Sequence, residues 1–222
     1  MQLNQLIDHT KLGPFVQLED IKTLITEGLK YEFKSLCVPT IYVKFVSEAL
    51  KNSNVLTCTV IGFPHGQHTK EVKAFETKQA ILDGADEIDM VINQTFVKER
   101  NEKACFEDIK AVVDQAQGKI VKVILETSNL TDEEIIFACN IATRAKANFV
   151  KTSTGFSQHG ATVHHVKLMK SHISKSMEVK ASGGISSYQD ALDLIEAGAT
   201  RLGTSKGVLL MNKGDHHANT SY

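Results

Sequence analysis

The stretch Asn148-Phe149-Val150-Lys151-Thr152-Ser153-Thr154-Gly155 joins a short apolar run to a lysine and then to a polar segment that reaches a glycine. If Phe149 and Val150 lie in a strand, Lys151 lies at its carboxyl end. In parallel α/β folds, catalytic side chains gather at that end of the strands. A surface lysine that only terminates a strand is the alternative, and the rest of the chain has to decide between the two.

The same alternation of apolar runs and helical segments recurs along the chain. The predicted strands are residues 6–7, 35–38, 55–61, 87–92, 120–125, 147–150, 177–180 and 201–202. Between them, apolar residues have helical spacing, as at Ile21, Leu24 and Ile25, and residues 131–134 and 187–190 have the pattern of capping boxes. Eight strand–helix units predict an α/β fold, a single-domain (β/α)8 TIM barrel over residues 1–210. A doubly wound open sheet is the alternative, but no Gly-x-Gly-x-x-Gly or P-loop supports it.

Composition excludes several classes of function. The 222 residues are 42% hydrophobic with a formal net charge of −1, which argues against nucleic-acid or membrane-surface binding through bulk charge. The chain has no signal-peptide pattern and no apolar run of about 20 residues, so we predict a cytoplasmic protein. Its four cysteines form no Cys-x-x-Cys pair, which favours reduced thiols. Neither a carboxylate nor a cysteine stands at ligand spacing beside His159, His164 and His165 or beside His216 and His217, so we predict no metal site.

Alternation within the predicted strands turns charged side chains towards the inside of the barrel. The outer face of each strand must be apolar because helices cover it, and residues such as Ile88, Met90 and Val179 supply that face. The alternate positions, which face the inside of the barrel, hold Asp89, Lys122, Lys151 and Lys180. Burying an unpaired charge costs several kcal/mol. These residues therefore form either a structural ion-pair cluster or a functional site at the mouth of the barrel.

Two lysines on neighbouring strands can activate each other. A free lysine has a pKa of about 10.4, whereas a nucleophilic amine needs a value nearer 7. A second ammonium group about 5–6 Å away contributes on the order of 3 kcal/mol at an effective dielectric constant near 20, and partial burial adds to it. We therefore predict that Lys151 attacks a carbonyl carbon to form an imine, that Lys180 lowers the pKa of Lys151, and that Asp89 carries protons.

Glycine-rich loops follow the last two predicted strands. Gly183 and Gly184 lie in the first loop, and Gly203, Thr204 and Ser205 lie in the second. Glycines let backbone N–H groups approach an anion, and the loops after the seventh and eighth strands of such barrels often bind phosphate. The two loops together predict a phosphorylated substrate.

These residues resemble the class I deoxyribose-phosphate aldolases over nearly the whole chain. The matching blocks are residues 7–10, 36–39, 60–64, 84–91, 121–127, 149–155, 179–184 and 196–201. The resemblance implies reversible cleavage of 2-deoxy-D-ribose 5-phosphate to acetaldehyde and D-glyceraldehyde 3-phosphate, through a Schiff base on Lys151, with Asp89 and Lys180 as proton carriers. It implies no metal or organic cofactor. It leaves a homodimer open, because family members are often dimers but no apolar patch of this sequence can be assigned to an interface.

The resemblance also assigns binding residues. Cys37, Lys122 and Thr152 are expected to bind the substrate, and Gly155, Gly183, Gly184, Gly203, Thr204, Ser205 and Lys206 its phosphate group. Where many members have arginine after Ile185, this chain has Ser186, so we predict that Lys206 supplies the missing cation. Tyr222 matches a terminal tyrosine that in some members folds over the site from a polar tail, here residues 211–222, and helps proton transfer.

Two other functions remain open at this point. A phosphosugar isomerase or epimerase on the same barrel could use Asp89 and Glu126 as acid and base, without an imine. A barrel that only binds sugar phosphates is the third alternative, but it leaves two inward lysines without a purpose.

Overall fold

Eight parallel strands close into a barrel in the computed structural model, which describes residues 2–218. Each strand pairs with its neighbour in the sequence, and β8 pairs with β1 to complete the ring. The strands are β1 (Ile7–Thr10), β2 (Ser35–Val38), β3 (Leu56–Ile61), β4 (Glu87–Val91), β5 (Ile120–Ile124), β6 (Phe149–Lys151), β7 (Glu178–Ser182) and β8 (Arg201–Thr204). The predicted TIM barrel is confirmed.

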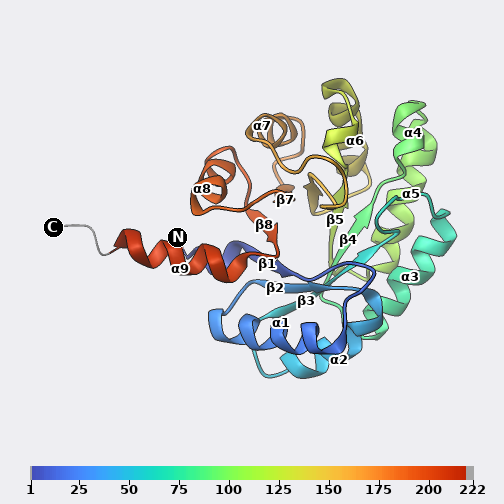
Figure 1. The fold of residues 1–222 in the computed structure, drawn as a ribbon. Coiled ribbons are helices and arrows are strands. Elements are labelled where there is room, and N and C mark those ends of the chain that lie inside the picture. The colour runs from blue at the N-terminus through green and yellow to red at the C-terminus, as the bar shows by residue number, and fades with distance from the viewer. Residues whose placement is uncertain (1, 219–222) are drawn as a thin grey trace.

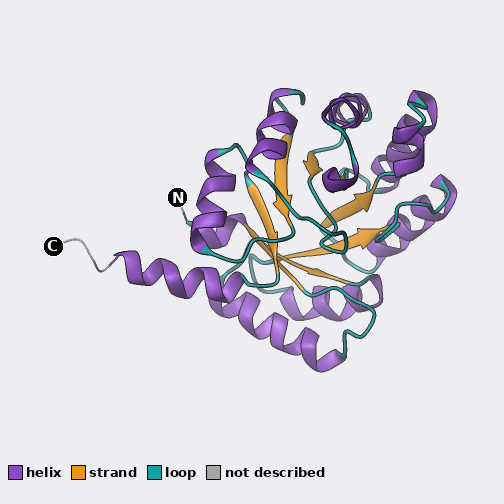
Figure 2. Cartoon of the chain, turned by 45° about the horizontal axis from the view of Figure 1, so that its top comes forward, coloured by secondary structure: helices purple, strands orange, loops and turns teal. Residues whose placement is uncertain are grey.

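Helices surround the strands and cover the outside of the barrel (Figures 1 and 2). They are α1 (Leu18–Tyr31), α2 (Val43–Leu50), α3 (Lys70–Leu82), α4 (Gln94–Lys98), α5 (Glu102–Gln115), α6 (Asp132–Arg144), α7 (Val163–Ser171), α8 (Tyr188–Glu196) and α9 (Gly207–Ala218). Three short 3-10 helices, η1 (Leu3–Leu6), η2 (Thr40–Tyr42) and η3 (Thr127–Asn129), complete the described part of the chain.

Local sequence explains where several helices begin. Thr131 and Glu134 form the predicted capping box at the start of α6, and Ser187 and Asp190 form the one at the start of α8. In each, a hydroxyl oxygen accepts from a backbone N–H of the first turn, and a carboxylate accepts from the N–H of the cap residue. These caps fix the points at which the loops above the barrel turn into helices.

The hydrophobic core lies between the strands and the helices. Ile88, Met90, Val123 and Val179 point outward from their strands and are fully buried. Burying an aliphatic side chain of this size contributes about 1.5–3 kcal/mol. The outer strand face is therefore apolar, as the alternation predicts, and the charged side chains at the alternate positions face the inside of the barrel.

The chain differs from the predicted boundaries in several places; β1, for example, runs on to Thr10 and β8 to Thr204, beyond the predicted ends at residues 7 and 202. Lys151 is the last residue of β6 rather than the residue after it. The predicted start of a polar tail at residue 211 falls inside α9, which runs to Ala218 and extends away from the barrel (Figure 1). Within residues 2–218, no helix is both long enough and apolar enough to cross a membrane.

Candidate active site

Four neighbouring strands bring the predicted charged residues together inside the barrel. Asp89 of β4 is the register partner of Lys122 of β5, and Lys151 of β6 is the partner of Lys180 of β7. All four side chains are buried. The parallel strands are paired so that these side chains all face inward, and residues up to 91 positions apart in the sequence therefore meet.

The Asp89 carboxylate is the centre of this arrangement. Its Oδ2 accepts hydrogen bonds of 2.7 Å from Lys151 Nζ and 2.7 Å from Lys180 Nζ, and its Oδ1 accepts one of 2.9 Å from Lys122 Nζ. Burial alone would raise the pKa of Asp89, but the positive charges of Lys122, Lys151 and Lys180 outweigh it and hold that pKa well below its usual range. Asp89 is therefore an ionised acceptor shared by three amines.

The structure modifies the predicted relation between the two lysines. Lys151 Nζ and Lys180 Nζ each donate to Asp89 Oδ2 at 2.7 Å, so the two amines are close but share a carboxylate oxygen. Burial would lower the pKa of Lys180, yet the Asp8 and Asp89 carboxylates outweigh it and raise that pKa above its usual value. Lys180 is thus a paired ammonium group that shares the Asp89 carboxylate with Lys151, and its predicted effect on Lys151 stays a prediction.

A second layer of buried charge lies on β1, β4 and β8, and its members Asp8 and Arg201 were not predicted from the sequence. Arg201 Nη1 lies 2.7 Å from Asp8 Oδ1 and 2.8 Å from Glu87 Oε2. Lys180 Nζ lies 2.5 Å from Asp8 Oδ2, and Lys122 Nζ lies 2.5 Å from Glu87 Oε2. The signal was present in the alternation of Asp8 with the core residue Ile7, but nothing in the sequence showed which cation Asp8 would meet.

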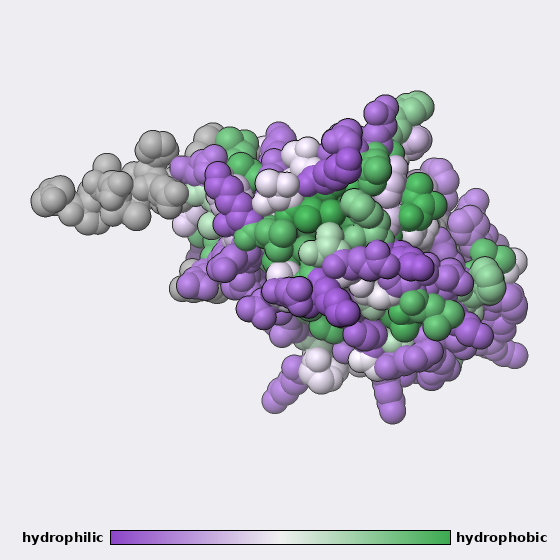
Figure 3. Space-filling view, turned by 90° about the horizontal axis from the view of Figure 1, so that it is seen from below, coloured by the Kyte–Doolittle hydropathy of each residue, from purple (hydrophilic) through white to green (hydrophobic). Residues whose placement is uncertain are grey.

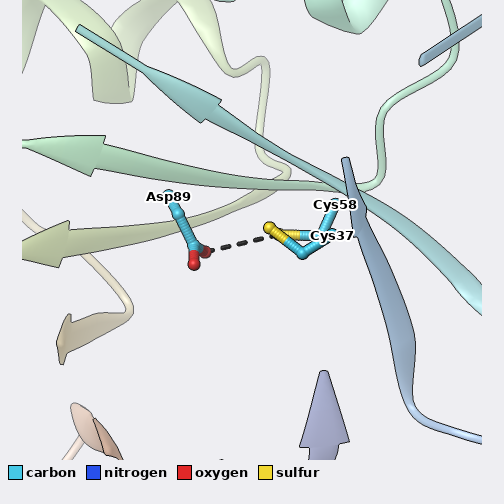
Figure 4. Close-up of side chains that lie close together, drawn as sticks. All are labelled: Cys37, Cys58 and Asp89. Atoms are coloured by element: carbon cyan, nitrogen blue, oxygen red, sulfur yellow. Dashed lines mark hydrogen bonds between the residues drawn. The ribbon is translucent and has the colours of Figure 1, made fainter. Parts of the chain in front are cut away.

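Two cysteines lie beside Asp89 (Figure 4). Cys37 of β2 and Cys58 of β3 are register partners, and Cys58 Sγ donates to Asp89 Oδ1 at 3.4 Å. A hydrogen bond from the Cys58 thiol lowers the pKa of Cys37, whereas burial raises the pKa of Cys58. All four cysteines are free, as predicted. Cys37 is fully buried, and its role in substrate binding stays a prediction.

A cavity of about 370 Å³ opens above this network, and Lys151 lies in its lining. All seven residues predicted to bind phosphate line it, namely Gly155, Gly183, Gly184, Gly203, Thr204, Ser205 and Lys206. Thr10, Leu12, Thr154, Phe156, Ser182, Ile185 and Ser186 also line it and had not been predicted as binding residues. Among these lining residues the charged ones are Lys151 and Lys206, and none is acidic. The cavity therefore suits an anionic ligand.

Close approach of two loops forms one wall of the cavity. Gly183 and Gly184 have φ values of 80° and 75°, a left-handed conformation that favours glycine. A Cβ atom on Gly160 would lie 2.1 Å from Gly183 O, so no larger residue fits at position 160. Ala161 N donates to Ser182 O and to Gly183 O, which ties the β6–α7 loop to the β7–α8 loop.

Comparison with known proteins identifies the family. The sequence model described as "DeoC/LacD family aldolase" matches residues 3–211. The chain belongs to this aldolase family. It is 50% identical to the deoxyribose-phosphate aldolase of Acholeplasma laidlawii, with full coverage of both chains. It is 55% identical to the one of Streptococcus sanguinis, with 97% of each chain covered.

Solved structures of aldolases have the same architecture. A putative deoxyribose-phosphate aldolase from Coccidioides immitis is 40% identical, with a TM-score of 0.94 over 96% of this chain and 86% of that one. The deoxyribose phosphate aldolase of Aeropyrum pernix, described as a unique tetramer, is 34% identical, with a TM-score of 0.90 over 96% of this chain and 91% of that one. The aldolase family predicted from the sequence motifs is therefore confirmed.

Other predicted site residues of this aldolase lie apart from the cavity lining or outside the described residues. Lys122 is buried beneath the cavity, among Asp8, Glu87 and Asp89. Thr152 Oγ1 donates to Ser182 O and accepts from Ser182 N, so it joins β6 to β7. Their roles as substrate-binding residues stay predictions. Tyr222 lies outside the described residues.

The carboxylate proposed for an isomerase is engaged elsewhere. Glu126 accepts from the backbone N–H of Thr154 at 3.2 Å and from the Thr154 hydroxyl group. It therefore anchors the loop that follows β6. No contact between Glu126 and Asp89 supports an acid–base pair in the described residues, and the isomerase alternative gains no support from the geometry.

Proposed function

We propose that this chain cleaves 2-deoxy-D-ribose 5-phosphate reversibly into acetaldehyde and D-glyceraldehyde 3-phosphate, with Lys151 as the amine that forms the Schiff base. Relatives that are 50% and 55% identical over 97% or more of the chain are named deoxyribose-phosphate aldolases, and this is the activity of the chain. It is a lyase, a class I aldolase of deoxyribose catabolism. The assignment of individual residues to steps is the part that we infer from the site.

One observation carries the assignment of Lys151. Among the amines of the buried network, Lys151 is the one that lines the cavity, and it does so one hydrogen bond from an ionised carboxylate. Lys122 and Lys180 are fully buried below it. A carbonyl carbon in the cavity can therefore reach Lys151, while the other two amines are shielded.

Charge balance in the network favours the loss of one proton. It contains four cations, Lys122, Lys151, Lys180 and Arg201, and three carboxylates, Asp8, Glu87 and Asp89. A set with one excess positive charge in a low-dielectric interior is stabilised when a proton leaves it, because the remaining charges then pair completely. A neutral amine, which is the form that attacks a carbonyl carbon, is consistent with this balance.

Asp89 and Lys180 are placed to move protons during the reaction. Once the imine has formed at C1 of the sugar, the proton of the C3 hydroxyl group leaves, the C2–C3 bond breaks, and an enamine remains on Lys151. Protonation of C2 and hydrolysis of the imine then release acetaldehyde. Asp89 lies within one hydrogen bond of both Lys151 and Lys180, so protons can pass between the two amines through its carboxylate.

The phosphate group is proposed to lie at the opposite wall of the cavity. Gly183, Gly184 and Ser205 line that wall with their backbone. Helix α9 begins beside it, and the N–H groups at a helix N-terminus favour an anion. Lys206 supplies a positive charge beside them. This arrangement holds the phosphorylated end of the sugar away from Lys151 and places C1 towards it.

Reduction with borohydride in the presence of acetaldehyde tests the function. An imine on Lys151 becomes a stable secondary amine, so we expect the mass to increase by one ethyl group in place of one hydrogen, and peptide mapping to find that group on Lys151. Lys151→Ala should abolish the adduct. Lys206→Ala is the matched control, since acetaldehyde carries no phosphate and trapping should persist. Turnover without any trapped adduct would indicate an isomerase-like mechanism and refute the proposal.

Two broader properties remain proposals. A cytoplasmic location is supported by the four free, buried cysteines, which are typical of a reducing compartment. A homodimer is supported by apolar side chains exposed on neighbouring segments, such as Ile41 at 79% and Phe45 at 40%. The face that includes α1 and α2 shows apolar side chains gathered among hydrophilic ones (Figure 3).

A further inference from the structure

We propose that Asp132, His164 and His165 form a binding site for a transition-metal dication of the zinc type, at the surface where α6 and α7 begin. One potential ligand atom from each of the three residues lies within 4.8 Å of the other two. Two imidazole rings and a carboxylate are a ligand set that Zn²⁺ and its neighbours Co²⁺, Ni²⁺ and Cu²⁺ accept. The site is separate from the aldolase cavity, whose lining includes none of the three.

The side chains of the three residues lie close together. His164 Nε2 lies 2.8 Å from Asp132 Oδ2, and the centroids of the His164 and His165 rings are 5.5 Å apart. His165 Nδ1 is buried and has no hydrogen-bond partner among the described residues. His165 therefore has a ring nitrogen that no described protein group uses as a hydrogen-bond partner.

Spacing along the sequence was the only reason to expect no metal ion at His164 and His165. Neither a carboxylate nor a cysteine stands near His164 and His165 in the sequence, but Asp132 lies 32 positions before His164 and comes from a different helix. The fold brings it in because α6 and α7 pack side by side around the barrel (Figure 1). The reason for excluding a metal site therefore fails once the chain is folded.

Local electrostatics permit a cation at this place. Two helices begin here, and their N-terminal ends carry partial positive charge that would disfavour a dication. The first turn of α6 offsets this with Asp132, Glu133 and Glu134.

The exposure of the ligands defines the kind of site. The side chains of His164 and Asp132 are 64% and 48% exposed, so water can fill the remaining coordination positions. An ion held there would link α6 to the start of α7. The start of α7 follows Ala161, whose N–H holds the β6–α7 loop against the wall of the cavity. We therefore expect bound metal to raise the thermal stability of the folded chain.

Calorimetric titration of the full-length, untagged protein with ZnCl2 after removal of metal by EDTA tests the proposal. The chain also has a histidine pair near its end, so the background is the double variant His216→Asn/His217→Asn. In this background we expect one equivalent of Zn²⁺ to bind and to raise Tm. Asp132→Asn, His164→Asn or His165→Asn should each weaken binding at least tenfold and remove the rise in Tm, as loss of a ligand requires.

Matched controls keep the result interpretable. His172→Asn, at the other end of α7, should leave Zn²⁺ binding unchanged, and each ligand variant without metal should unfold at the same temperature as the background. Mg²⁺ should give no comparable binding, since it prefers oxygen ligands. Absence of Zn²⁺ binding in the background would overturn the proposal, as would binding that survives all three ligand substitutions or binding of Mg²⁺ with equal affinity.

Discussion

Replacing Lys122 by methionine removes one ammonium group from the buried charge network and keeps the side chain nearly the same length. Lys122 Nζ lies 2.5 Å from Glu87 Oε2 and 2.9 Å from Asp89 Oδ1, and the side chain is fully buried. In the variant, Glu87 keeps Arg201 as a partner, and Asp89 keeps Lys151 and Lys180. Both carboxylates stay buried with one cation fewer.

The expected cost follows from this loss. Removing one partner of a buried ion pair destabilises a protein by about 3–5 kcal/mol, because the remaining charge stays desolvated. Both carboxylates retain other cations here, so we expect the lower end, about 3 kcal/mol. For a chain of this size, 1 kcal/mol corresponds to about 2–4 °C in Tm. Lys122→Met should therefore lower Tm by about 6–12 °C.

Urea unfolding followed by circular dichroism measures the free energy, and Lys119→Met is the matched control. Lys119 pairs with Asp86 at 3.0 Å, but the two side chains are 46% and 34% exposed. An exposed pair contributes about 0–1 kcal/mol. The control should thus unfold close to the wild type, which separates the buried network from the loss of a lysine as such.

A double-mutant cycle with Asp89→Asn isolates the Lys122–Asp89 contact. The single Asp89 variant leaves three buried ammonium groups without their shared carboxylate, whereas the double variant has one of those cations removed as well. We expect the double variant to be more stable than the sum of the single effects predicts, by about 1–3 kcal/mol. Additive effects, or a cost of Lys122→Met no larger than that of Lys119→Met, would refute the reasoning.

Three further outcomes are expected. Lys206→Ala should raise the KM for the phosphorylated sugar and leave the KM for unphosphorylated 2-deoxyribose nearly unchanged, since Lys206 is the second cation of the cavity lining; steady-state kinetics with both sugars would show an unchanged ratio if Lys206 has no part in phosphate binding. Burial would raise the pKa of Asp8, but the charges of Lys180, Lys122 and Arg201 outweigh it and lower that pKa. The ionised Asp8 therefore stabilises the fold above its unfolded pKa of about 3.9, and this stabilisation is lost as the pH falls below that value. Asp8→Asn should accordingly make Tm less dependent on pH below about 4 than in the wild type, and an unchanged acid limb in calorimetric scans would contradict this. Deletion of Tyr222 should lower kcat for the phosphorylated substrate if the terminal residue takes part in proton transfer, and wild-type turnover in the truncated enzyme would exclude that role.

The fold and the inner charges were predictable because they depend on local alternation. A strand turns successive side chains to opposite faces, so Ile88 and Met90 had to face the helices, and Asp89 had to face inward. The same parity placed Lys122, Lys151 and Lys180. Capping boxes at Thr131 and Ser187 were equally local, and both are present.

Partners across the barrel were not predictable from the sequence. Nothing near Asp8 indicated that Arg201 would lie 2.7 Å away, because that pairing requires β8 to close against β1. For the same reason the Asp89 carboxylate was expected as a proton carrier, but not as the bridge between Lys151 and Lys180. The carboxylate that meets His164 was missed in the same way, since it comes from the preceding helix.

Ring closure between the first and last strands also constrains the order in which the chain can become stable. The hydrogen bond from Arg201 to Asp8 spans 193 positions. Arg201 also pairs with Glu87, which pairs with Lys122 as well. A growing chain that stops before β8 has these carboxylates without that guanidinium group, and its first strand has an unpaired edge. Synthesis must therefore reach the last strand before Asp8 and Glu87 gain their guanidinium partner and β1 is paired on both edges, so release of nearly the whole chain from the ribosome precedes the native state.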